Sequence, residues 1–221
     1  MKKIKVGIIG AGGIAQAAHI PSLKKTEGVE ITAIADINKE KVEYVGEKFE
    51  IKNTFTEWEK LIKADIDAVV ICSPNALHAE QSIKAMESGK DVLCEKPVCL
   101  TSEEAEKIFR VAERTGRIFM AAFPRRFSGE AKVLKPMIDK GELGEIYYIK
   151  AGYLRRRGIP GLGTWFTDKK LAGGGPMMDV GVHMLDLVIY LAGAPEPEII
   201  IGSKYEKFKD KAVDGGWPPL E

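Results

Sequence analysis

The sequence contains few of the residues that build disulfide frameworks and metal centres. Its 221 residues include three cysteines with no C-x-x-C spacing, and no two of its three histidines lie close enough for a local metal motif. Cys72 and Cys94 each end an apolar run typical of a buried strand, which predicts reduced thiols in or near a core. The sequence therefore predicts no metal site, and a chain of this length needs no disulfide to fold.

An excess of charge of one sign is also missing. Lysine and arginine number 33 against 32 acidic residues, so the formal net charge is +1. A surface built for duplex nucleic acid or anionic lipid would carry a basic excess, so neither partner is expected. The longest small or apolar stretch, residues 6–15, is too short and glycine-rich to span a bilayer, and no cleavage-type pattern follows it. We therefore expect a cytoplasmic protein.

The first half of the sequence alternates apolar runs with helix-like segments. Strands are expected at residues 4–9, 30–35, 68–72, 91–94 and 118–122, and helices at residues 14–25, 39–49, 56–62, 75–88 and 102–115. The run at 68–72 is continuously apolar, as expected of a strand covered on both faces. Repeated strand–helix units predict an α/β fold, a doubly wound parallel sheet of the Rossmann type.

The alternation stops near residue 122, which places a domain boundary between residues 1–122 and residues 123–221. The second part predicts helices at 130–140 and 177–191, with strand candidates around 146–153 and 198–201. It is therefore predicted to be an α+β domain. From residue 204 the chain is polar and ends rich in glycine and proline, which predicts little secondary structure there.

The strongest local pattern is a glycine-rich turn at the end of the first expected strand. This G-x-G-x-x-A turn runs through Gly10, Gly12, Gly13 and Ile14 to Ala15. The first glycine permits a tight turn, the second admits a pyrophosphate close to the backbone, and the small third residue lets helix pack on strand. The helix that follows offers unpaired N–H groups to phosphates. A bare flexible turn is the alternative, but the flanking elements and an acid about 20 residues on favour dinucleotide binding.

That acid is Asp36, at the end of the second expected strand. A carboxylate there can accept hydrogen bonds from both hydroxyls of an adenosine ribose and would repel a 2′-phosphate. Ile37 and Asn38 supply no cation directly after the acid, although Lys39 and Lys41 lie near. The pattern favours NAD over NADP.

Three further stretches make the pattern specific: SPNALH at residues 73–78, EKP at 95–97 and GGGPMMDVGVHMLD at 173–186. Together with the glycine turn, and in this order, they resemble the glucose-fructose oxidoreductase, inositol dehydrogenase and rhizopine catabolism (Gfo/Idh/MocA) family from about Lys3 to about Gly202. The resemblance implies an NAD(P)-dependent oxidoreductase that transfers a hydride between nicotinamide and a sugar, polyol or related hydroxyl or carbonyl substrate. It also implies a homo-oligomer.

The first two stretches directly follow expected strands, so their residues should line one crevice, because ligands of an open parallel sheet bind outside the carboxyl ends of its strands. Besides the glycine turn and Asp36, the candidates for cofactor binding are Ser73, Asn75, His78, Glu95 and Lys96. Asn75 is also placed to cap a helix. A surface helix position is the alternative for His78, and a solvated turn is the alternative for residues 95–97.

Lys96 beside a nicotinamide could hydrogen-bond a substrate hydroxyl and stabilise alkoxide character as hydride leaves, the role that the resemblance implies. Asp179 and His183 are four residues apart and share a helix face. On the residues alone, a satisfied polar cluster is favoured there. The resemblance instead implies a catalytic face, with His183 as acid/base and Asp179 as its partner or a substrate ligand. Trp165 could form the floor of a sugar pocket, and plain packing is its alternative.

The chain departs from the family in its second domain, which members build on a large, mainly antiparallel sheet. Two strand candidates would form a remnant that is marginal alone, so we expect a shortened domain with an incomplete substrate pocket. A natural short form, a fragment and a frameshift product all remain open. So do two alternatives to a dehydrogenase: a nucleotide-binding relative with little turnover, and an enzyme that recycles tightly held NAD.

Overall fold

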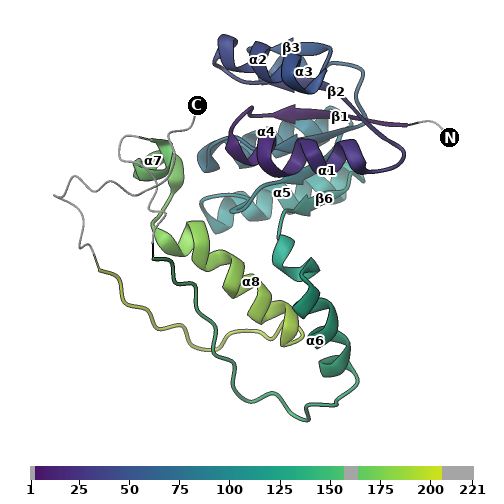
Figure 1. The fold of residues 1–221 in the computed structure, drawn as a ribbon. Coiled ribbons are helices and arrows are strands. Elements are labelled where there is room, and N and C mark those ends of the chain that lie inside the picture. Colours follow the sequence, from purple (N-terminus) through teal and green to yellow (C-terminus); the bar gives the residue numbers. More distant parts are fainter. Residues whose placement is uncertain (1–2, 157–163, 206–221) are drawn as a thin grey trace. The chain divides into compact units, whose positions relative to one another are not determined.

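The computed structural model describes residues 3–156 and 164–205. The polar tail is predicted from residue 204, and its residues from 206 onward lie outside the described part. The chain divides into two compact units, with the division along the sequence between Ala122 and Phe123 (Figure 1).

The first unit is built on a six-stranded parallel sheet in the order β3-β2-β1-β4-β5-β6. Its strands are β1 (Ile4–Ile9), β2 (Val29–Ala35), β3 (Asn53–Phe55), β4 (Ala68–Ile71), β5 (Asp91–Cys94) and β6 (Phe119–Ala121). The chain starts at the centre, winds to one edge, then returns beside β1 and winds to the other edge. This is the strand order of dinucleotide-binding Rossmann folds, so the predicted fold class is confirmed.

Helices cover both faces of this sheet (Figure 1). The helical elements, with η marking 3₁₀ or π turns, are η1 (Ala15–His19), α1 (Ile20–Lys25), α2 (Lys39–Phe49), α3 (Trp58–Leu61), η2 (Asn75–Leu77), α4 (His78–Glu87) and α5 (Ser102–Thr115). The helix predicted at 14–25 is thus a π turn continued by an α-helix.

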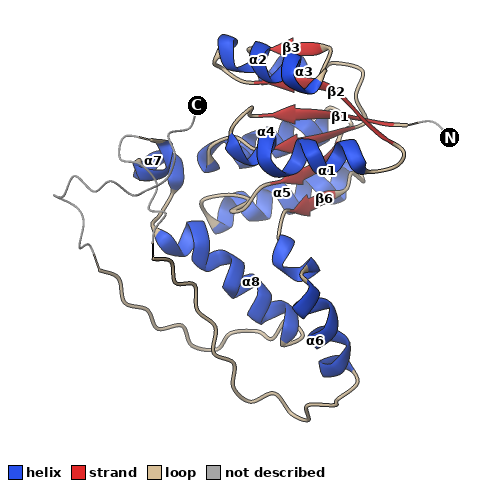
Figure 2. Cartoon of the chain, in the orientation of Figure 1, coloured by secondary structure: helices blue, strands red, loops and turns tan. Residues whose placement is uncertain are grey.

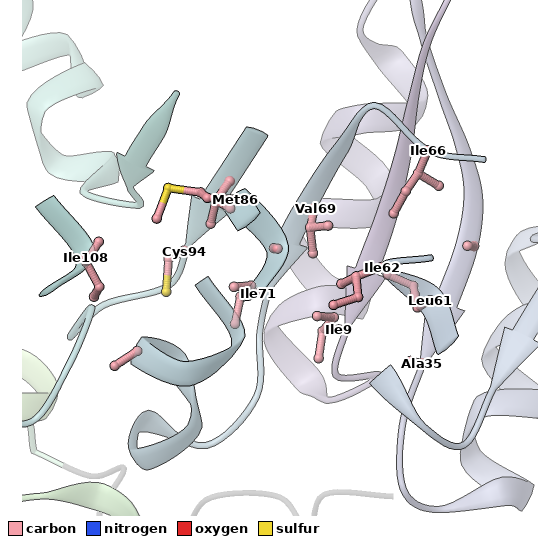
Figure 3. Close-up of a cluster of buried hydrophobic side chains, with 14 of the residues drawn as sticks. Ile9, Ala35, Leu61, Ile62, Ile66, Val69, Ile71, Met86, Cys94 and Ile108 are labelled. Atoms are coloured by element: carbon pink, nitrogen blue, oxygen red, sulfur yellow. The ribbon is translucent and has the colours of Figure 1, made fainter. Parts of the chain in front are cut away.

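Two apolar cores lie on opposite faces of the sheet. Ile8 packs with Ile20 and Val42 of the α1 and α2 face, whereas Ile9 joins the core that α3, α4 and α5 cover. Figure 3 shows this second core, with Cys94, Met86 and Ile108 in one group. Because successive side chains of a strand point to opposite faces, a strand buried on both sides needs the continuous apolar runs seen in the sequence. Full burial of each such side chain is worth about 1.5–3 kcal/mol.

Local caps fix the helix ends. Thr101 and Glu104 form a capping box at the start of α5, and Gly116 ends it with φ at 64°. The Asn38 side chain accepts a hydrogen bond from the Lys41 amide at the start of α2. Each such cap contributes about 1 kcal/mol to stability, and its residue pattern allows the helix boundary to be predicted from sequence.

The second unit is helical where the structure describes it. Its elements are η3 (Pro124–Phe127), α6 (Gly129–Asp139), η4 (Trp165–Thr167), α7 (Lys169–Ala172), η5 (Met177–Gly181) and α8 (Val182–Leu191). The predictions of strands around 146–153 and 198–201 are wrong, because both segments are loops (Figure 2). A strand needs a partner for its backbone groups, and no described residue of this unit pairs with either segment. Tyr147 and Ile201 are accordingly 94% and 91% exposed.

Candidate functional site

The glycine turn follows β1 and is shaped by the neighbouring strand. Gly10 has φ at +98°, and a Cβ built on it would lie 2.6 Å from the carbonyl oxygen of Cys72. A side chain is therefore excluded there by conformation and by space. At Gly12 a Cβ would meet nothing within 4 Å. The turn thus leaves its backbone open at the glycine where a pyrophosphate needs close approach, so these residues fit a dinucleotide.

Asp36 is tied to this turn. Its Oδ2 accepts a hydrogen bond from the Ala11 amide at 2.9 Å, and its Oδ1 accepts one from the Asn38 amide at 2.9 Å. The carboxylate is therefore oriented by two backbone amides, one in the glycine turn and one just after β2. Ile37 beside it is 90% exposed, and Lys39 pairs with Glu43 at 3.8 Å along α2. The role of Asp36 toward a ribose stays a prediction.

His78 ties the loop after β4 to the loop after β5. It is 1% exposed, so the surface alternative is wrong. Its Nε2 lies 2.8 Å from the carbonyl oxygen of Ser73 and its Nδ1 lies 2.7 Å from that of Pro97. The Ser73 hydroxyl donates to the amide oxygen of Gln81 at 2.6 Å. With both ring nitrogens facing backbone carbonyls, His78 joins the two loops. Its role toward a cofactor stays a prediction.

Asn75 opens η2 as its first residue, and the cap position before it is Pro74. The expectation that Asn75 is a helix cap is therefore wrong, because Asn75 occupies the first position of the helical turn and Pro74 occupies the cap position. Asn75 is 6% exposed. Its role toward a cofactor stays a prediction.

Lowering the pH should weaken the fold through His78. Burial lowers the His78 pKa below its ordinary value of 6.5, and the two carbonyl contacts oppose that effect only in part. The unfolded chain therefore takes up a proton at a higher pH than the folded chain, so the free energy of unfolding falls as the pH drops below about 6.5. Urea unfolding at a series of pH values should show this fall, and His78→Gln should flatten it. Identical pH slopes in the two proteins would contradict the assignment.

The Glu95–Pro97 turn follows β5, and the Lys96–Pro97 peptide bond is cis. The Glu95 amide donates to the carbonyl oxygen of Ile71 at 2.9 Å. The Glu95 Oε1 lies 2.7 Å from Nε2 of His19, whose side chain is 13% exposed against 14% for Glu95. The Lys96 amide donates to Oε2 at 3.1 Å. A solvated turn is therefore the wrong description of Glu95.

The acidity of Glu95 follows from these contacts. Burial alone would raise its pKa, but the hydrogen bond and charge of His19 and those of Lys96 outweigh burial and lower the pKa below the ordinary 4.5. Glu95 is therefore a carboxylate at neutral pH.

In the second unit, Asp179 lies in the π turn η5 and His183 is the second residue of α8; both side chains are half-buried. Asp186, three residues after His183, is paired with Arg126: its Oδ2 accepts a hydrogen bond from Nε at 2.9 Å and its Oδ1 accepts one from Nη2. Trp165 stacks on Phe166 with ring centroids 3.7 Å apart. The roles of Asp179, His183 and Trp165 toward a substrate stay predictions.

The structure brings together most of the residues of the first unit that the sequence singles out. Gly10 lies against the Cys72–Ser73 backbone, Asp36 bonds the glycine turn, and His78 joins the two later loops. Sequence analysis did not predict the contacts of His19, Gln81 and Arg126. The signal for His19 is its place in the helix behind the glycine turn, but its partner lies 76 residues away.

In the described part of the chain, the cysteines and other metal-ligating side chains form no further site. Cys72 and Cys94 are buried, and burial raises the Cys94 pKa to about 12 and the Cys72 pKa well above its ordinary value. Among the described residues no group of histidine, cysteine and acidic side chains could hold a metal ion. No described helix is long and apolar enough to cross a bilayer.

Comparison with known proteins agrees with this geometry. Residues 4–123 match the GFO_IDH_MocA family model, described as an oxidoreductase family with an NAD-binding Rossmann fold, and residues 132–211 match the GFO/IDH/MocA C-terminal domain. D-Glucoside 3-dehydrogenase of Escherichia coli (strain K12) is 34% identical over 98% of this chain and 62% of its own length. Inositol 2-dehydrogenase of Corynebacterium glutamicum (strain R) is 30% identical over 99% of this chain and 62% of its own length.

A solved structure described as levoglucosan dehydrogenase in complex with NADH is similar with a TM-score of 0.75 and 29% identity, over 87% of this chain and 54% of that one. The chain therefore spans less than two thirds of the length of these relatives. The prediction of NAD as cofactor is confirmed by the family model, which describes an NAD-binding Rossmann fold. Since both family models match in order along one chain with the observed Rossmann topology, the chain belongs to the Gfo/Idh/MocA family of oxidoreductases.

Proposed function

We propose that the protein is an NAD-dependent dehydrogenase that moves a hydride between nicotinamide and a CH–OH carbon of a sugar, polyol or related substrate. The observation that carries the proposal is the placement of the glycine turn, Asp36 and the Glu95–Pro97 turn at strand ends of one sheet. The relatives named as D-glucoside and inositol dehydrogenases support a hydroxyl-bearing carbon as the reacting centre.

The residues divide into those that bind the cofactor and those that shape its crevice. The amides of the turn through Gly10, Gly12, Gly13 and Ile14 would hold the phosphates, and Asp36 would accept from the ribose hydroxyls. Ser73 and Asn75 would line the same crevice, and His78 and Glu95 would act through the turn that they hold.

Bound NAD would supply the hydride acceptor. The Lys96 ammonium would donate a hydrogen bond to the reacting hydroxyl oxygen and stabilise its negative charge as the hydroxyl proton leaves. His183 would take that proton, and Asp179, four residues earlier, would orient the imidazole or bind a second substrate hydroxyl. Trp165 would offer an apolar face to a sugar ring.

A second candidate is nucleotide binding with little or no turnover. The absence of a sheet in the described part of the second unit favours it, because the unit then offers few rigid surfaces for a substrate.

Calorimetric titration with NAD and an NADH absorbance assay against D-glucose, a methyl glucoside and myo-inositol separate the candidates. Saturable NAD binding with turnover of a substrate supports the dehydrogenase. Binding without turnover supports the second candidate, and no binding contradicts both. Tightly held NAD that co-purifies and never exchanges would instead indicate recycling.

Replacing Asp36 tests the cofactor preference. Asp36→Ala removes two charge-assisted hydrogen bonds to ribose and should raise the NAD dissociation constant about 10–100-fold. Asp36→Asn keeps an acceptor without charge, so it should improve NADP binding relative to NAD. Calorimetry with both nucleotides measures these changes, and Glu43→Ala on α2 is the control. An unchanged NAD to NADP ratio in both Asp36 variants would contradict the role of the carboxylate.

A further inference from the structure

The Glu95–Pro97 turn is held at both outer residues, with Lys96 between them. His19 contacts the Glu95 carboxylate at 2.7 Å, and His78 contacts the Pro97 carbonyl at 2.7 Å. We propose that the His19–Glu95 pair is a positioning device for Lys96, which fixes the turn so that the lysine side chain meets the reacting hydroxyl. This inference rests on the role proposed for Lys96.

The pair is built into the fold. His19 is the last residue of η1, the segment behind the glycine turn, and Glu95 directly follows β5. Both side chains are nearly buried. Removing one partner of a buried ion pair strongly destabilises the folded protein, because it leaves an uncompensated buried charge. The contact thus links the phosphate-binding segment to the Lys96 turn.

The second carboxylate oxygen of Glu95 contacts Lys96 directly. Oε2 of Glu95 accepts the amide of Lys96 itself at 3.1 Å. The imidazole, the carboxylate and the Lys96 backbone therefore form one hydrogen-bonded series. A loosened turn would displace the ammonium group, and a displacement of about 1 Å costs about 100-fold in rate when a reacting group must be aligned.

Charged and titratable groups surround Glu95 from each neighbouring element: His19 from η1, Lys96 on the turn, His78 from α4, Cys72 after β4 and Cys94 at the end of β5. His19 and Lys96 lower the Glu95 pKa against the effect of burial. Without His19, burial has less opposition and the pKa of Glu95 rises. A His19→Ala enzyme should therefore lose activity at a higher pH than the wild type when it is acidified.

A double-mutant cycle on kcat tests the inference, with NAD and whichever substrate of the glucose, glucoside and inositol panel turns over. We expect His19→Ala to lower kcat about 10–100-fold with the NAD dissociation constant nearly unchanged. His19→Gln keeps an N–H donor and should recover most of the loss. In a Lys96→Ala background, His19→Ala should add no further loss, because its effect passes through Lys96. Lys24→Ala, which breaks an exposed ion pair between α1 and Glu50 at the end of α2, is the control.

Hydrogen exchange at the Lys96 amide supplies a readout without turnover or NAD. His19→Ala should speed this exchange, and His19→Gln and Lys24→Ala should leave it near the wild-type rate. An additive kcat loss in the double variant, an acid limb that does not move, or an unchanged Lys96 exchange rate would each overturn the inference. If no protein in the set turns over any substrate, the proposed function fails, and the exchange rate alone then decides whether the pair holds the turn.

Discussion

Lys96→Ala should lower kcat for NAD reduction about 10²–10⁴-fold, the range usual for loss of a group that handles a proton in the transition state. The substituted side chain is the one that the proposal places on the reacting hydroxyl. Glu95 and Pro97, which hold the turn by other contacts, are left in place. The NAD dissociation constant and the melting temperature should therefore change little.

Steady-state kinetics with matched calorimetry measures this effect. Lys84→Ala, in an exposed pair with Glu80 on α4, removes a lysine from the same unit and should keep wild-type kcat. A Lys96→Ala enzyme that turns over at the wild-type rate would remove the lysine from the mechanism. A rise in the NAD dissociation constant alone would make Lys96 a binding residue only.

Gly10→Ala should destabilise the first unit by about 2–5 kcal/mol, because alanine is strained at positive φ and its methyl group overpacks the site. The methyl group would meet the carbonyl oxygen of Cys72 at 2.6 Å. Cys72 directly follows β4 and its amide donates to the Ile9 carbonyl at 2.7 Å, so its backbone has little freedom to move aside. Thermal unfolding should show a large fall in melting temperature with or without NAD.

Gly12→Ala is the matched variant. Its added methyl group meets nothing within 4 Å, so folding should be nearly unaffected. The methyl group would instead occupy the space that a pyrophosphate requires, so the NAD dissociation constant should rise at least about tenfold. Equal losses of stability in the two variants would contradict the distinct roles assigned to the two glycines.

The elements predicted from sequence are those whose signals are local. The helix expected at 102–115 is α5, because Thr101, Glu104 and Gly116 specify its ends within a few residues. The strands of the first unit follow from apolar runs that two faces must bury. The short edge strand β3 was missed, since its three residues have no apolar pattern and form a strand only by pairing with β2.

The wrong or missing predictions concern segments whose structure depends on residues far away in the sequence. The alternation at 146–149 is typical of a strand, yet this segment finds no neighbour in the described chain. The ion pair between Asp186 and Arg126 is of the same kind, because it joins residues 60 apart in sequence and the pattern around His183 does not predict it. That the candidate cofactor residues lie near one another could be predicted, because the carboxyl ends of parallel strands lie at the same edge of the sheet. The contacts that His19 and His78 make could not, since they join loops far apart in sequence.

The close approach of Gly10 to Cys72 has a consequence for the thermodynamics of nucleotide uptake. The backbone after the neighbouring strand holds the turn in its shape without a ligand. The turn is therefore preformed, and NAD binding does not have to order it. Association should then carry little penalty from chain ordering. The heat capacity change of NAD binding should equal the value expected from the apolar surface that the nucleotide buries, with no further contribution from folding of the turn.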